Sequence, residues 1–268
     1  MSAHKPGTQR PGTANPAGGR PAADRRADVS RETLRGVRGE NRPADRPDTL
    51  SRAHLERLAG IARAVGTPLP FQFQPACESF LAELTKWSRR INLISAGDRT
   101  RVVERHVLDS LCLLAYEGRL AGKQLLDVGP GAGFPGLVLA MWDSGARFTL
   151  VESRSKPVAF LKSVRRSLGL ANVEVVHARF ESAAISGQIP PADIVTSRAV
   201  GGTVRLAALA APLLKPGGAV VVYAARRPST RALTADDRRA LGRLGLTVGF
   251  VTPPWQTLTT LLILRKLS

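Results

Sequence analysis

The segment Leu125–Gly136, with the sequence LLDVGPGAGFPG, constrains the fold of this chain more than any other. An apolar strand ends at an acid and runs into a loop with glycine at every second position, before an apolar, helix-like segment that continues to Trp142. Glycines at this density let the backbone turn sharply and approach a ligand without a Cβ in the way. The following helix directs its amino-terminal N–H groups toward the same crevice. The segment therefore predicts a strand–loop–helix unit that binds a cofactor.

Two kinds of cofactor loop fit this segment. Gly131, Gly133 and Gly136 satisfy the G-x-G-x-x-G pattern of dinucleotide-binding folds, and Glu152 ends a second apolar strand about twenty residues after the loop begins. Asp127 followed by alternating glycines is instead typical of S-adenosylmethionine-dependent methyltransferases, because the ammonium group of that cofactor suits a carboxylate. A carboxylate at the strand end would repel a pyrophosphate. In both cases Glu152 is the expected partner of ribose hydroxyls, and the loop alone favours the methyltransferase only modestly.

Strand-like and helix-like segments alternate through the rest of the chain. This alternation predicts an α/β fold with a mostly parallel sheet built from right-handed βαβ units, in which the last two strands form an antiparallel edge hairpin. Helices are expected at 136–142, 156–168 and 203–214. Strands are expected at 124–128, 147–151, 173–176, 194–196, 219–223, 246–251 and 259–265.

A helical region is expected before the sheet, as an amino-terminal cap over about 49–120. One helix begins at Ser51, a second carries Phe80, Leu84, Trp87 and Ile91 on one stripe, and a third covers 102–116. Residues 1–48 hold six prolines, six glycines and almost no large apolar side chains, so they cannot bury a core. We expect them to be a disordered basic tail, or a stretch upstream of the true start, preceding a methyltransferase domain at 49–268.

The composition points to a polyanionic partner and to a cytoplasmic protein. The chain has 39 basic and 21 acidic residues, a net charge of +18 that lies mostly outside the first 48 residues. Cys77 and Cys112 fall in apolar helical patterns without metal-ligand spacing, so we expect reduced core cysteines and no metal. No apolar run is long enough to cross a membrane, and no signal peptide is evident.

Three further motifs fit a methyltransferase. Lys215–Gly218, KPGG, is a tight turn that often precedes the fifth strand of class I methyltransferases. Phe180 and Glu181 follow the third strand, where such folds surround the adenine, although ordinary core packing explains Phe180 equally well. Ser197–Ala199 ends the fourth strand, which faces the substrate. Its central Arg198 only donates hydrogen bonds, so it suits an acceptor edge of a base or a phosphate.

The helix expected at 102–116 carries polar residues on one side. Arg105 and Asp109 are one helical step apart and are expected to pair, and His106 lies within reach of Asp109. No third ligand follows, which argues against a metal site. Capping and substrate contact are equally good explanations of these polar residues.

The chain resembles the RsmG/GidB family of 16S rRNA guanine-N7 methyltransferases. The matching pieces are Trp87–Leu93, Arg105–Ser110, Leu126–Gly136 and Ser197–Ala199, in family order and at family distances, over roughly residues 55 to 265. The resemblance implies a class I S-adenosylmethionine methyltransferase fold with a Rossmann-like seven-stranded sheet. It also implies cofactor contacts at Gly129, Phe134, Phe180, Glu181 and Arg198.

This chain departs from the family pattern in two places. Many relatives have Lys-Gly after the fifth strand, whereas this chain has Arg226 and Arg227, so any role of that lysine would pass to one of these arginines. The tail of residues 1–48 has no counterpart in the family pattern.

The predicted function is methylation of guanine N7 in 16S rRNA, free or within the small ribosomal subunit, with S-adenosylmethionine. Arg198 would position the reactants, and no residue would act as acid or base, because N7 of neutral guanine carries a free lone pair. The alternatives are another RNA or base methyltransferase, a nicotinamide-dependent oxidoreductase, and an RNA-binding protein with a vestigial pocket. The expected cofactor residues are Asp127, Gly129, Gly131, Gly133, Phe134, Glu152, Phe180, Glu181 and Arg198. Candidates for phosphate contacts are Arg89, Arg90, Arg99, Arg101, Arg165, Arg166, Arg226 and Arg227.

Overall fold

A computed structural model describes residues 49–198, 202–225, 233–255, 257 and 259–267. The predicted tail at 1–48 lies outside these residues, as do Ala199 and the two candidate arginines Arg226 and Arg227. Within the described part of the chain, no helix has the length and apolar character needed to cross a membrane.

The centre of the described region is a seven-stranded sheet with the order β3-β2-β1-β4-β5-β7-β6. The first five strands in this order pair in parallel, and β7 pairs antiparallel with both β5 and β6. The predicted antiparallel pair is confirmed, and β7 is inserted beside β5 so that β6 forms the sheet edge. The strands are β1 (Gln124–Val128), β2 (Arg147–Glu152), β3 (Val173–His177), β4 (Ala192–Ser197), β5 (Leu214–Ala225), β6 (Leu246–Val251) and β7 (Thr259–Lys266).

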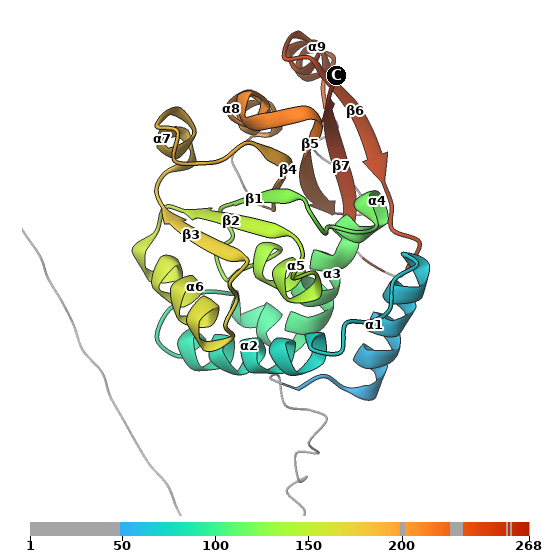
Figure 1. Cartoon of the computed structure of the whole chain (residues 1–268), viewed down its shortest axis with the longest axis vertical. Helices are drawn as coiled ribbons and strands as arrows, with labels where there is room; N and C mark the ends of the chain where they lie inside the picture. The colour runs from blue at the N-terminus through green and yellow to red at the C-terminus, as the bar shows by residue number, and fades with distance from the viewer. Residues whose placement is uncertain (1–48, 199–201, 226–232, 256, 258, 268) are drawn as a thin grey trace, which may run out of the picture. The chain divides into compact units, whose positions relative to one another are not determined.

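Helices cover both faces of the sheet, as the alternation of the sequence predicts (Figure 1). One face is covered by α1 (Arg52–Ala64), α2 (Phe73–Ser88), α5 (Gly136–Trp142) and α6 (Ser155–Ser167). The other face is covered by α7 (Phe180–Ile185), α8 (Thr203–Ala210) with a short 3-10 turn (Ala211–Leu213), and α9 (Ala235–Arg243). The sequence pattern does not predict α7 or α9. Each has few buried side chains, and α9 buries only Leu241.

The helical region before β1 differs from its prediction in two ways. Helix α2 ends at Ser88, so Ile91 lies beyond it rather than on its stripe. The single helix expected at 102–116 is a succession of short turns, which begins with a π-helix, η3 (Val103–Val107). The 3-10 helix η2 (Ala96–Arg101) precedes it, and α3 (Leu108–Ser110), η4 (Leu111–Leu113) and α4 (Leu114–Glu117) follow. A π turn within a helix frequently marks a functional site.

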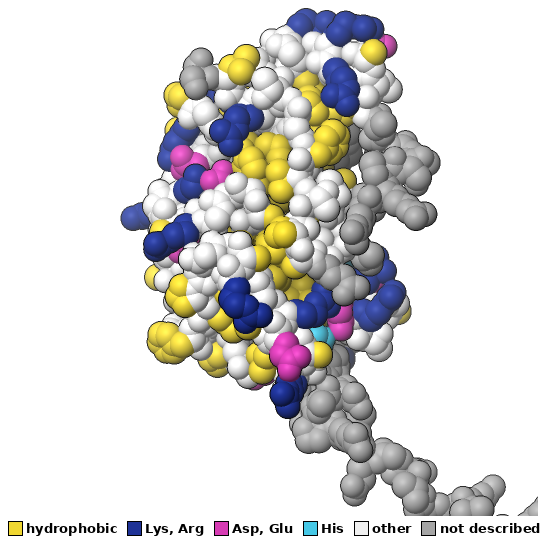
Figure 2. Space-filling view, turned by 90° about the vertical axis from the view of Figure 1, so that its right-hand side faces the viewer, with side chains coloured by type: hydrophobic (Ala, Val, Ile, Leu, Met, Phe, Trp, Pro, Cys, Tyr) yellow, Lys and Arg dark blue, Asp and Glu magenta, His cyan; other side chains and the backbone are white. Residues whose placement is uncertain are grey.

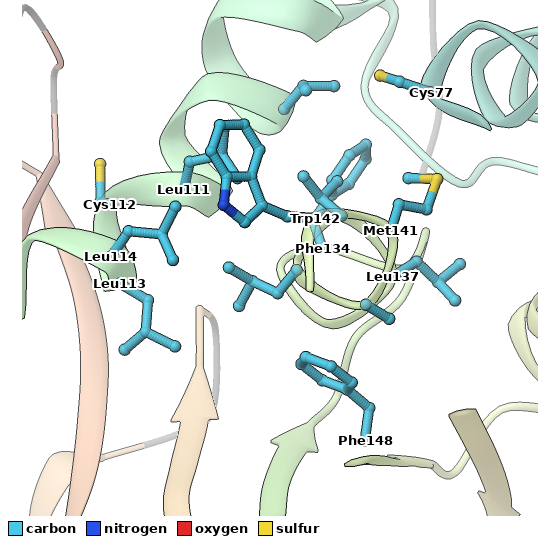
Figure 3. Packing of buried hydrophobic residues seen from close by; sticks show 14 of the residues in the cluster. Cys77, Leu111, Cys112, Leu113, Leu114, Phe134, Leu137, Met141, Trp142 and Phe148 are labelled. Carbon is cyan, nitrogen blue, oxygen red and sulfur yellow. The ribbon is translucent and has the colours of Figure 1, made fainter. Parts of the chain in front are cut away.

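The larger hydrophobic core joins these turns to α2, α5 and one face of the sheet. Figure 3 shows Leu111 and Trp142 in this core together with Phe134 from the glycine loop. Phe134 makes an edge-on contact with Phe80 of α2, with ring centroids 5.4 Å apart. Cys77 and Cys112 are both buried and free, as predicted. The core therefore fixes the glycine loop against the helical region that precedes the sheet.

Candidate active site

The glycine loop leaves the carboxyl end of β1 in backbone conformations that favour glycine. Gly129, Gly131 and Gly133 have φ angles of 69°, 55° and 90°. A Cβ on Gly133 would collide with the Leu137 side chain, and a Cβ on Gly136 would lie 2.7 Å from Oδ2 of Asp127. The loop therefore requires glycine for its own geometry as well as for access to a ligand.

Asp127 ties the end of β1 to the start of α5. Its Oδ2 accepts a hydrogen bond from the backbone N–H of Gly136 at 2.7 Å, while its Oδ1 is buried without a hydrogen-bond partner among the described residues. Burial raises the pKa of Asp127 to about 7, although the Gly136 N–H and the charge of Arg198 both act to lower it. The carboxylate thus has unused capacity for a donor or a positive charge.

Glu152 at the end of β2 holds the loop from the other side. Its Oε2 accepts the backbone N–H of Gly131 at 3.1 Å, and its Oε1 accepts the backbone N–H of Arg154 at 2.9 Å. The Arg154 side chain also donates to Oε1 through Nε at 3.3 Å. Glu152 is 3% exposed, so this carboxylate is a buried anchor at the mouth of the crevice.

A cavity of about 510 Å³ opens beside Glu152, at the carboxyl ends of β1 and β2. In open α/β sheets, ligands bind at this edge. Its volume is in the usual range for a pocket that holds a small molecule. The lining includes four of the predicted cofactor residues, Gly129, Glu152, Phe180 and Glu181. It also includes Ser153, Arg154, Arg179 and Arg205, which the sequence does not single out.

Arg198 belongs to a different group of residues, next to the helical region. Its Nη1 lies 3.3 Å from Nδ1 of His106, and its Nη2 donates to the carbonyl of His106 and to Oγ of Ser110, both at 3.2 Å. Its Cζ lies 5.8 Å from the ring centroid of Phe134 and 5.0 Å from that of Tyr223. The end of β4 is therefore bound to the turns that precede the sheet.

His106 is stacked on Phe134, with ring centroids 4.9 Å apart and an angle of 22° between the planes. Burial, and after it the charge of Arg198, lowers the pKa of His106 to about 4. The imidazole is therefore neutral at physiological pH. Because arginine only donates, Nδ1 of His106 is the acceptor and the ring proton lies on Nε2.

Comparison with known proteins decides the family of the chain. The family model described as "GidB: rRNA small subunit methyltransferase G" matches residues 74–246. The chain belongs to the GidB family. Ribosomal RNA small subunit methyltransferase G of Myxococcus xanthus (strain DK1622) is 36% identical over 180 residues, which cover 67% of this chain and 82% of the relative. The protein of that name from Sorangium cellulosum (strain So ce56) is 39% identical over 202 residues, or 75% of this chain and 82% of the relative.

A solved structure supports the fold. Cofactor-bound Rv0187 from MTB superposes with a TM-score of 0.51 and 21% identity, over 72% of this chain and 91% of that chain. The predicted class I methyltransferase fold is confirmed. As a member of this methyltransferase family, the chain uses S-adenosylmethionine as its cofactor. The nicotinamide-dependent oxidoreductase is not the right assignment.

The structure separates the predicted site residues of the GidB-family chain into two groups. Gly129, Glu152, Phe180 and Glu181 line the cavity, whereas Asp127, Phe134 and Arg198 lie in the buried contacts behind the glycine loop. Phe180 also belongs to a second cluster of buried hydrophobic residues, on the face of the sheet that α7 and α8 cover. It therefore packs in the core and lines the cavity at the same time. Gly131 and Gly133 shape the loop between the two groups.

One predicted contact is wrong. Arg105 does not pair with Asp109, because its Nε lies 3.1 Å from Oδ1 of Asp98. The carboxylate of Asp109 instead accepts a hydrogen bond from Thr257, which lies far along the chain. In the described residues, no group of three or more His, Cys, Asp and Glu side chains is arranged to hold a metal ion.

Sequence reasoning missed several residues that complete the site. Arg205 of α8 donates to Glu181 of α7 at 2.9 Å across the cavity wall, and the hydroxyl of Tyr223 donates to the carbonyl of Ser110 at 2.8 Å. No local pattern joins such distant residues. Arg154 could have been predicted, because it follows the expected ribose-binding residue Glu152 by only two positions.

Proposed function

We propose that this chain transfers a methyl group from S-adenosylmethionine to N7 of a guanine in small-subunit rRNA, either free or assembled into the subunit. Membership of the GidB family over residues 74–246 carries this proposal. The position of the cavity, at the sheet edge where open α/β folds bind ligands, supports it.

The residues around the cavity fit the cofactor. The buried Glu152 carboxylate would accept hydrogen bonds from ribose hydroxyls, and the apolar Phe180 would pack on the adenine beside Glu181. Asp127 does not line the cavity, but it has a buried oxygen without a partner among the described residues just behind the glycine loop, and its carboxylate would attract the ammonium group from there. S-adenosylmethionine supplies an electrophilic methyl group, carried on a sulfonium.

The task of the chain is then to align and desolvate the reactants. Orientation of two bound reactants alone contributes several kcal/mol to a reaction of this kind. Arg198 is suited to positioning, because its guanidinium is held by His106, Ser110 and two aromatic rings rather than by solvent. Its buried Nε has no hydrogen-bond partner among the described residues, which leaves one donor for an acceptor edge or a phosphate.

The chemistry of the site fits N7 better than a group that carries a proton. N7 of guanine has a free lone pair, so the reaction needs no general base. His106 is a poor base here, because its pKa is about 4 and its Nδ1 already accepts a hydrogen bond from Arg198. A ring nitrogen is therefore the nucleophile that this site favours.

A deletion strain tests the proposal. Small-subunit rRNA from cells that lack the protein should lose one 7-methylguanosine in a mass map of modified nucleosides. A plasmid copy of the gene should restore that modification, whereas a copy with Glu152→Gln should restore it poorly. An unchanged map in the deletion strain, or the loss of a different modification, would contradict the proposed function.

A further inference from the structure

Positive charge is spread over this protein and does not mark one binding face by itself. The chain carries a net charge of +18. In the face shown in Figure 2, lysine and arginine side chains lie at several places, with hydrophobic side chains between them. The surface that binds RNA must therefore be identified from its distance to the site and from arginines that form no salt bridge within the protein.

Four exposed arginines gather where α2 ends and η2 follows. None of them forms a salt bridge within the described part of the chain. Nη2 of Arg99 donates to the carbonyl of Ser88 at 3.2 Å, which holds η2 against the end of α2, and Arg89 and Arg99 border the same small hollow. We call Arg89, Arg90, Arg99 and Arg101 the η2 arginine cluster.

The η2 arginine cluster is next to the proposed active site. Asp98, in the same 3-10 helix, pairs with Arg105 and has Oδ2 3.8 Å from Nε2 of His106. The other ring nitrogen of His106 lies 3.3 Å from Arg198, and its ring is stacked on Phe134 of the glycine loop. A short chain of contacts therefore joins the cluster to the residue that we propose positions the base.

A second pair of exposed arginines lies at the opposite edge of the sheet. Arg165 and Arg166 are in the last turn of α6. Arg165 borders a hollow of about 980 Å³ together with Gln124 and Arg147, which begin β1 and β2. The 510 Å³ cavity, in contrast, opens at the carboxyl ends of these strands. The η2 arginine cluster is thus linked by contacts to Arg198 at the carboxyl end of β4, whereas Arg165 lies at the amino ends of the strands.

We propose that the η2 arginine cluster binds the phosphates of the rRNA on either side of the target guanine, and that Arg165 and Arg166 do not. This inference rests on the proposed function. Guanidinium groups are planar forks of donors that match phosphate oxygens, and free groups on the surface engage them without loss of an internal salt bridge. The cluster would supply affinity and register, while the site beyond Arg198 reads the base.

Two double variants with equal charge changes test this inference. Arg90→Glu with Arg101→Glu removes two arginines whose side chains make no hydrogen bond within the described residues, and Arg165→Glu with Arg166→Glu is the matched control. Binding of small-subunit rRNA is measured at several salt concentrations, and unfolding midpoints and S-adenosylmethionine affinity are measured for each protein. Both double variants should be folded at the assay temperature and keep the wild-type cofactor affinity, although the control loses some stability because its carboxylates lie at the carboxyl end of α6.

The cluster variant should bind rRNA about tenfold or more weakly than the control variant, with a reduced dependence of affinity on salt. Arg90→Lys with Arg101→Lys should keep most of the affinity, because the charge remains. Equal losses in the two Glu variants, or a larger loss in the Arg165 and Arg166 variant, would overturn the inference. If the wild type itself does not methylate small-subunit rRNA, the proposed function fails first, and this result is distinct from a failure of the surface assignment.

Discussion

Nη1 of Arg198 lies 3.3 Å from Nδ1 of His106, although 92 residues separate the two in the chain. This contact joins the end of β4 to the π-helix that precedes the sheet. It also fixes the protonation state of His106, because the donor-only guanidinium requires a neutral ring with a free lone pair on Nδ1. The pKa of about 4 agrees with this arrangement.

The acceptor on Nδ1 predicts different effects for two substitutions of His106. The side-chain oxygen of His106→Asn can take the place of Nδ1 and accept from Arg198, whereas His106→Gln places its polar group nearer to Nε2. We expect single-turnover methyl transfer to be nearly normal in the Asn variant and about tenfold slower in the Gln variant, because the positioning of Arg198 changes. Equal rate losses that follow the loss of folding stability would show a purely structural role.

Asp127 predicts an unusual dependence of stability on pH. Its folded-state pKa of about 7 is above the ordinary value of 3.8, so the folded protein takes up this proton before the unfolded chain does. The contribution of Asp127 to stability therefore rises as pH falls from about 7 to about 4. Relative to wild type, Asp127→Asn should be more destabilised at pH 5 than at pH 8, by about 2 kcal/mol. Urea unfolding at both pH values measures this difference, and no difference would contradict the shifted pKa.

His106 predicts a dependence of stability on pH that is opposite to that of Asp127. Its folded-state pKa of about 4 is below the ordinary value of 6.5, so the unfolded chain takes up this proton first and stability falls as pH drops through this range. Relative to wild type, His106→Asn should therefore become more stable at pH 5 than at pH 8. The same urea measurements apply, and a change in the same direction as that of Asp127→Asn would contradict the assignment.

Substitutions at two glycines with positive φ distinguish the effect of backbone strain from an effect on cofactor binding. Gly131 has a φ of 55° in the glycine loop, and Gly217 has a φ of 72° near the start of β5, away from that loop. Gly131→Ala and Gly217→Ala should each lose about 1 kcal/mol of stability. Only Gly131→Ala should also lose affinity for S-adenosylmethionine, as measured by calorimetry. Equal cofactor affinities in the two variants would place the ligand away from this loop.

Local sequence patterns predict the strands and helices whose apolar residues follow a clear periodicity. The strand at 124–128 and the helix at 136–142 agree with the structure, because a continuous apolar strand, a glycine loop and an apolar helix follow one another in the sequence. Helix α9 was missed because it is strongly polar and buries only Leu241. An exposed helix of this kind has no apolar stripe that a sequence pattern can detect.

The site was predicted less completely, because its contacts are long-range. The residues of the cavity follow strands that the sequence locates, so Gly129 and Glu152 were found. The partner of Arg105 could not be predicted, because Asp98 lies in a 3-10 helix that no periodicity in the sequence indicates. Asp109, which has the helical spacing for such a pair, accepts a hydrogen bond from Thr257 instead. Tertiary contacts of this kind override the helical spacing of neighbouring charges.

The rate of methyl transfer should depend little on pH. N7 of guanine carries no proton that must be removed, and the pKa of His106 is about 4, so neither group titrates between pH 6 and pH 9. Asp127 has a pKa of about 7, but saturation with cofactor removes any effect of its titration on cofactor binding from the measured rate. Single-turnover rates are measured with saturating RNA and cofactor from pH 6 to pH 9. A rate that falls tenfold per pH unit on the acid side, with this limb absent from His106→Gln, would mean that a base removes a proton.

The identity of the methylated atom tests the account most directly. Purified protein is incubated with small-subunit rRNA from a strain that lacks it and with S-adenosylmethionine that carries an isotopically labelled methyl group. The rRNA is then digested, and the labelled nucleoside is identified by mass spectrometry. We predict that the label is in 7-methylguanosine, at one site per rRNA molecule. Label in an exocyclic amine or a ribose 2′-hydroxyl, or no transfer of label by the folded, cofactor-binding protein, would contradict the account.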